Sequence, residues 1–197
     1  NFPTSYYPMS LLIPNTVKYI KPRAFYQVKN VTMNLDFGDG ISIEERSFQE
    51  CTGLLSINFT GIVKKLGDRC FQDCINLHTI SLIEVEVIGA FSFANCINLI
   101  RWFSISDKTK IIGKYAFSFC ERMQGNLTIP DSVIEIGENA FHECYRLNGS
   151  LTLSRNMKHI SDFLFFGCTR LTGPLIIPDC VETIGTNAFF LCMSLNG

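Results

Sequence analysis

The sequence predicts an α/β-type repeat solenoid, in which about eight similar chain segments stack along one axis. The first observation is a phenylalanine that recurs every 22 to 24 residues over most of the 197-residue chain, at Phe25, Phe48, Phe71, Phe93, Phe117, Phe141, Phe165 and Phe189. The second is that a segment of this length is too small to bury its own apolar face, so it must stack on its neighbours. Together, the period and the segment length favour a solenoid.

The first element of each repeat is predicted to be a short strand. Leu127 and Ile129 flank Thr128, and this alternation places two side chains inside a strand and one outside. The corresponding inner pairs are Leu11/Ile13, Leu35/Phe37, Ile57/Phe59, Ile80/Leu82, Phe103/Ile105, Leu151/Leu153 and Leu175/Ile177. Stacked one repeat apart, these strands predict a parallel sheet along one side. Pro130 then ends the strand because proline cannot donate to the ladder.

The rest of the repeat is predicted to be a turn and a short helical segment. Residues 133–137 follow the pattern VxxIG, which we interpret as a turn whose glycine supplies a backbone angle that other residues resist. Residues 140–147 carry apolar side chains at Ala140, Phe141, Cys144 and Leu147. This spacing predicts a single helical or 3₁₀ turn on the opposite, convex side.

These motifs resemble the BspA-type leucine-rich repeats, a family found mainly on surface proteins of anaerobic bacteria and of protist parasites. The resemblance rests on the LxIP opening, the VxxIGxxAFxxCxxL body and the repeat length, and it covers residues 11–197. It implies a curved leucine-rich-repeat horseshoe with a parallel concave sheet, used for adhesion or other protein binding. It implies no catalytic residues.

Composition is consistent with a single folded domain. Hydrophobic residues make up 47% and charged residues 18% of the chain, and the formal net charge is −1. We expect one repeat domain over residues 11–197, preceded by a flank or partial cap at residues 1–10. The small net charge gives no reason to expect binding to nucleic acid. No run of 18 apolar residues occurs, so we expect no membrane insertion by this segment.

The cysteines are predicted to be packing residues. The sequence has nine, of which seven fall three residues after a marker phenylalanine, at Cys51, Cys74, Cys96, Cys120, Cys144, Cys168 and Cys192. Val28 occupies this position in the first repeat, which favours packing over disulfide formation. Cys70 and Cys74 form a CxxxC pair, but the three histidines lie in different repeats at different phases. We therefore expect no metal site and no cofactor.

Catalysis is not expected either. The sequence contains no GxSxG, HExxH, phosphate-loop or dinucleotide-binding motif, and a repeat spreads its polar residues over an open surface. Two nonenzymatic hypotheses remain. One is a cell-surface or extracellular adhesin that engages host or neighbouring-cell ligands; the other is a cytoplasmic structural scaffold within a larger assembly.

Four sequons would allow glycosylation in a secretory pathway, at Asn30, Asn58, Asn126 and Asn148. The alternative interpretation is that Ser and Thr are simply favoured at outward strand positions. Free thiols suit a reducing compartment and favour the scaffold hypothesis.

A protein or glycoprotein ligand is predicted to bind the concave face. Its contact residues would be the outward side chains Thr79, Ser81, Trp102, Ser104, Asn126 and Thr128. Trp102 is the only tryptophan, and tryptophan is enriched among residues that dominate interfaces. It would stand just before the inward Phe103, with Lys108 and Lys110 at the rim. The alternative is that Trp102 packs over the surface without a ligand.

The final residues of the sequence match an earlier segment of the repeat. Leu195–Gly197 match Leu147–Gly149, after which another strand would begin. An uncapped last repeat leaves strand edges and apolar groups open, which natural solenoids avoid. We therefore expect further repeats, or another chain, at this C-terminal edge.

Overall fold

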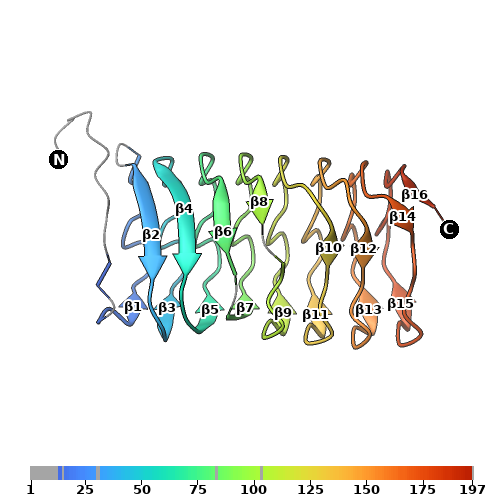
Figure 1. Ribbon diagram of the computed structural model, residues 1–197, viewed down its shortest axis with the longest axis horizontal. Coiled ribbons are helices and arrows are strands. Elements are labelled where there is room, and N and C mark those ends of the chain that lie inside the picture. The colour runs from blue at the N-terminus through green and yellow to red at the C-terminus, as the bar shows by residue number, and fades with distance from the viewer. Residues whose placement is uncertain (1–12, 15, 30–31, 83, 103, 197) are drawn as a thin grey trace.

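The computed structural model describes residues 13–14, 16–29, 32–82, 84–102 and 104–196 as a parallel-stranded β-solenoid. In Figure 1 the coils lie side by side in chain order, with the N-terminal end at the left and the C-terminal end at the right. Within the described residues, seven coils carry a strand on each of two faces, and β1 and β16 flank them. The predicted flank at residues 1–10 lies outside the described part.

Most of the predicted strands lie on the first face, here called the LxI face. Its strands are β2 (Met33–Phe37), β4 (Leu54–Phe59), β6 (Thr79–Ser81), β8 (Arg101–Trp102), β10 (Leu127–Thr128), β12 (Leu151–Thr152), β14 (Gly173–Pro174) and β16 (Leu195–Asn196). The strand predicted at Leu175/Ile177 is not formed there, and β8 ends before the predicted pair Phe103/Ile105. All pair in parallel, in three groups: β2 to β8, β10 with β12, and β14 with β16. The alternation is confirmed in β2, where Leu35 is buried between exposed Asn34 and Asp36.

The VxxIG segments form a second parallel sheet, here called the VxxIG face, so their interpretation as turns was wrong. The strands are β1 (Tyr19–Ile20), β3 (Ile41–Ile43), β5 (Val63–Leu66), β7 (Val85–Ile88), β9 (Ile111–Ile112), β11 (Glu135–Ile136), β13 (His159–Ile160) and β15 (Thr183–Ile184). β1 to β11 pair in order, as does β13 with β15. A β-branched residue fits a pleated, half-buried surface. The lateral hydrogen bonds to the neighbouring coil then extend the segment into a strand.

The glycine that ends each VxxIG segment is required for close approach between coils. Gly113 does not have a positive φ, which corrects the expected role of this glycine. A Cβ atom at Gly113 would lie 2.5 Å from the backbone nitrogen of Ala90 in the preceding coil, and at Gly67 it would lie 2.5 Å from the carbonyl carbon of Glu44. Gly113 also donates its N–H to the carbonyl of Ile88 over 2.7 Å. A side chain here would therefore push two coils apart.

The third side of each coil, here called the turn face, is built from consecutive tight turns. No helix or 3₁₀ segment occurs in the described residues, so the predicted helical turn is not found. In the coil around Phe48, one turn is closed by the bond from Ser47 N to Glu44 O. A second turn is closed by the bond from Cys51 N to Phe48 O. The third residues of these turns, Arg46 and Glu50, have φ of 56° and 58°. This left-handed conformation at non-glycine residues interrupts any helix.

In the view of Figure 1, which looks onto the LxI face, the coils form a nearly straight row. The turn face is laterally hydrogen-bonded as well: Phe141 N donates to Leu164 O in the next coil, and Glu143 N donates to Phe166 O. Backbone bonds therefore join coils on the turn face in addition to the two strand faces. The concave curvature of the LxI face stays a prediction.

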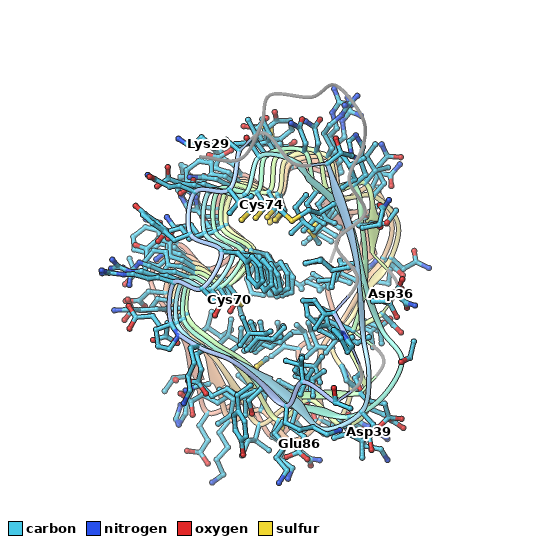
Figure 2. All side chains as sticks on the ribbon, turned by 90° about the vertical axis from the view of Figure 1, so that its left-hand side faces the viewer. Lys29, Asp36, Asp39, Cys70, Cys74 and Glu86 are labelled. Carbon is cyan, nitrogen blue, oxygen red and sulfur yellow. The ribbon has the colours of Figure 1, made fainter. Side chains whose placement is uncertain are left out.

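Two ladders of identical residues fill the interior (Figure 2). The marker phenylalanines stack one on the next, with centroid separations of 4.7 to 5.7 Å and interplanar angles of 18° or less. Beside them runs the row of cysteine sulfurs, labelled at Cys74 in Figure 2. Phe141, Cys144 and Leu127 are fully buried, as predicted. Offset aromatic stacking adds stabilisation beyond the buried area.

Candidate ligand-binding surface

Polar side chains form hydrogen-bonded rows along the N-terminal half of the LxI face. The Ser56 hydroxyl donates to Oδ1 of Asn34 over 2.6 Å, and Asn58 Nδ2 donates to Oδ1 of Asp36 over 3.1 Å. Asp36 lies on this outer surface in Figure 2. Because adjacent strands in a sheet are about 4.8 Å apart, the rows hold donors and acceptors at regular intervals. The surface can therefore hydrogen-bond an extended partner without rearranging.

Five of the six predicted contact residues lie on this face. Thr79 pairs with Ser56 and Ser81 with Asn58, so both continue the polar rows and are half-buried. The other three, Ser104, Asn126 and Thr128, are exposed. The structure places these residues on one face but in separate groups of paired strands, because β8 and β10 do not pair.

Trp102 lies at a register different from the predicted one. Its backbone pairs with Ile80, an inward position, rather than with the outward Thr79 or Ser81. The reason is the length of the preceding link: Phe71 lies nine residues before Ile80, and Phe93 lies nine residues before Trp102. The sequence pattern predicts that Phe103 takes the inward position and Trp102 the outward one. The side chain of Trp102 and all of Phe103 lie outside the described residues.

The sequon asparagines occupy two kinds of position. Asn58, Asn126 and Asn148 are exposed, and Asn30 lies outside the described residues. The Asn58 amide nitrogen is engaged by Asp36 within the polar rows. By contrast, Asn126 and Asn148 use their Oδ1 atoms, which accept the backbone N–H groups of Ser150 and Gly125 over 3.0 and 2.9 Å. Their amide nitrogens are thus turned away from these contacts.

The cysteine ladder is chemically protected. Each of the seven thiols donates to the carbonyl of the marker phenylalanine in the preceding coil, with Sγ to O distances of 2.9 to 3.3 Å. Burial raises the pKa of Cys144 to about 12 and that of Cys51 to about 11. Since the thiolate is the reactive form, these side chains are poor nucleophiles and poor metal ligands at neutral pH.

A groove crosses the LxI face in the C-terminal half, and sequence reasoning missed it. Its volume is about 840 Å³. It is lined by three successive coils, at residues 128–131, 151–153, 155 and 176–180. A groove depends on the relative heights of neighbouring side chains, and a single repeat does not reveal these.

The arrangement of the described side chains and elements also bears on metal binding and on membranes. Over the described ranges, no group of three or more His, Cys, Asp or Glu side chains is placed to hold a metal ion. In the same part of the chain, no helix has the length and apolarity needed to cross a membrane.

Comparison with known proteins agrees with a leucine-rich-repeat solenoid. The family pattern described as BspA type leucine rich repeat region matches residues 7–124 and 86–197, with six copies. A leucine rich repeat protein of T. pallidum has a similar crystal structure, with a TM-score of 0.70 and 23% identity over 95% of this chain and 78% of that chain. A leucine rich cell surface protein from Faecalibacterium prausnitzii gives a TM-score of 0.48 and 21% identity over 95% of this chain and 71% of that chain. No curated protein matches the chain.

Proposed function

The chain belongs to the BspA-type leucine-rich repeat family, and we propose that it is a noncatalytic binding domain of a cell-surface adhesin. Its ligand would be a protein or glycoprotein on a host or neighbouring cell. The observation that carries this proposal is the LxI face, where Thr79, Ser81, Ser104, Asn126 and Thr128 present small polar side chains. Small outward residues permit close approach of a partner along the whole stack.

The state of the thiols bears on the compartment. Free cysteines had favoured a cytoplasmic scaffold. Burial of Cys144 and the thiol hydrogen bond that it donates to Phe117 suppress its oxidation in either compartment. The cysteine ladder therefore gives no reason to prefer the cytoplasm. The surface proposal rests on the binding face and on family membership.

Location and binding can be tested separately. Intact cells that produce the protein are treated with a biotinylating reagent that does not cross membranes, and labelling of the protein supports surface exposure. Fluorescently labelled chain is then titrated onto neighbouring or host cells, and saturable binding is expected. An unlabelled protein in intact cells, together with labelling after lysis, would support the cytoplasmic scaffold instead.

A pair of matched variants tests which face binds. Thr79→Lys with Thr128→Lys places two long charged side chains on the LxI face, and Ser42→Lys with Thr183→Lys does the same on the VxxIG face. We expect only the first pair to reduce cell binding. Equal loss in both variants, with circular dichroism spectra unchanged, would contradict a site on the LxI face.

A further inference from the structure

Two prolines line the groove, one in each of its outer coils. Pro130 and Pro178 are half-buried and occupy the same position of the repeat, with Ser154 in the coil between them. Ser154 is fully buried, and its hydroxyl donates to the carbonyl of Val133 over 2.7 Å, so it does not line the groove. Two coil steps separate the prolines by about 10 Å. The groove therefore extends across three coils, with a proline at each side.

The groove walls are aliphatic. Ile176 is 68% exposed, which is unusual for an isoleucine on a folded surface, and Thr128 and Thr152 precede it in the same row. Among the described residues that line the groove, none is aromatic. Sugar rings are generally bound by stacking on aromatic side chains, so this lining favours an aliphatic protein side chain over a glycan.

The charged residues at the rim are unequally paired. Arg155 donates from Nε to Asp131 Oδ2 over 2.9 Å and from its terminal nitrogen over 2.5 Å, and its backbone N–H donates to Asp131 Oδ1 over 2.8 Å. Asp179 stands at the equivalent position in the next coil and makes no ion pair or hydrogen bond with the residues that the structure describes. The Asp131 and Arg155 charges cancel, so the groove retains one uncompensated negative charge.

We propose that the groove binds a peptide segment of a protein partner in which an aliphatic side chain adjoins a lysine or arginine. The aliphatic group packs against Ile176 in the groove that Pro130 and Pro178 line, and the basic group pairs with Asp179. This assignment rests on the proposed binding function and names the partner chemistry for one part of its surface. It requires no movement of the Asp131–Arg155 pair.

A phage-displayed library of random 12-residue peptides provides the probe. Selection on the immobilised chain is expected to enrich sequences with Leu, Ile, Val or Met next to Lys or Arg. The most enriched peptide is then synthesised with a fluorophore, and its affinity is measured by anisotropy. Asp179→Asn and Ile176→Ser should each weaken binding by about tenfold.

Two controls match these variants. Asp107 occupies the position of Asp179 three coils earlier and is exposed, and Ile134 is 58% exposed outside the groove. Asp107→Asn and Ile134→Ser should leave the affinity unchanged. Urea unfolding of all four variants shows whether a loss of binding reflects a loss of structure.

The proposal is overturned by a selection that yields no binder, by enriched peptides without a basic residue, or by affinity that is insensitive to both groove variants. Titration on cells separates this result from the adhesin proposal. If the chain binds cells but Asp179→Asn does not weaken that binding, the adhesin proposal stands and the groove assignment fails. If the chain does not bind cells but the selected peptide shows the expected sensitivity, the groove assignment stands alone.

Discussion

Cys144 donates its thiol hydrogen to the carbonyl oxygen of Phe117, with 3.1 Å between Sγ and O. The same oxygen accepts the backbone N–H of Cys120 over 3.1 Å within its own coil. Each such carbonyl is therefore satisfied once from its own coil and once from the next. Val28 occupies the cysteine position in the first repeat. A valine fills the same kind of position without donating a hydrogen bond.

Replacing Cys144 separates its packing role from its hydrogen-bonding role. Cys144→Val fills the space but removes the donor, so we expect the free energy of unfolding to fall by about 1 kcal/mol, since Phe117 keeps one hydrogen bond. Cys144→Ala should cost more because it also leaves a cavity. Urea denaturation measures both variants. Equal stability of Cys144→Val and the unsubstituted chain would show that the thiol acts only through its volume.

The buried thiols also predict a loss of stability in alkaline solution. Burial raises the pKa of Cys144 from 9.0 to about 12, so above pH 9 the unfolded chain loses this proton before the folded chain does. Rising pH therefore favours unfolding, by up to about 1.4 kcal/mol per pH unit for each such thiol. Below pH 9 this contribution is fully present.

Urea denaturation at pH 8, 9, 10 and 11 should show this decline. Cys144→Val should show a shallower decline, because one buried thiol is gone while the others in the column remain. If the free energies of unfolding of the two proteins decline equally with pH, Cys144 does not contribute to the loss of stability in alkaline solution.

Removal of one ring should destabilise more than one coil. Phe141 stacks between Phe117 and Phe165 at centroid separations of 5.4 and 5.7 Å. Phe141→Ala should cost about 3 to 5 kcal/mol. Since adjacent coils share this interface, faster hydrogen exchange should extend into the coils on both sides. Exchange confined to residues 127–150 would show that the coils are not energetically coupled.

The VxxIG glycines predict a second, steric effect. Gly113→Ala should reduce the free energy of unfolding by about 2 kcal/mol or more, because the new methyl group overlaps the backbone of Ala90. Gly125 offers the comparison, since its φ is 100° and a Cβ there would meet no atom within 4 Å. Gly125→Ala should therefore cost only its backbone strain, about 1 kcal/mol. A smaller loss at Gly113 than at Gly125 would contradict close coil approach as the reason for glycine.

The predicted role of Trp102 remains to be tested by substitution. If its side chain is an anchor for the ligand, Trp102→Ala should weaken binding to cells by about 2 kcal/mol or more, while thermal unfolding stays unchanged. The alternative hypothesis is a structural role for Trp102, because its backbone pairs with the buried Ile80. A lowered unfolding temperature with unaltered affinity would assign Trp102 to the core.

The sequence was sufficient for residues whose roles repeat exactly. Phe141 and Cys144 have counterparts at constant spacing, so their period alone predicted two interior columns. The hydrogen bonds between coils leave no such signal in the sequence. The tight turns leave none either, since Arg46 and Glu50 adopt positive φ although neither residue type favours it. The second sheet and the tight turns both depend on the hydrogen bonds between coils. The groove was missed for a related reason, since its lining combines side chains of three coils and no single repeat contains it.

The stack makes the number of coils a measure of its length. Every coil advances the array by one strand spacing of about 4.8 Å. Duplication or deletion of a whole coil would preserve the contacts between Cys144-type thiols and Phe117-type carbonyls at the new junction. Such an event would change the length of the array by one strand spacing. The extent of the LxI face could therefore change in uniform increments.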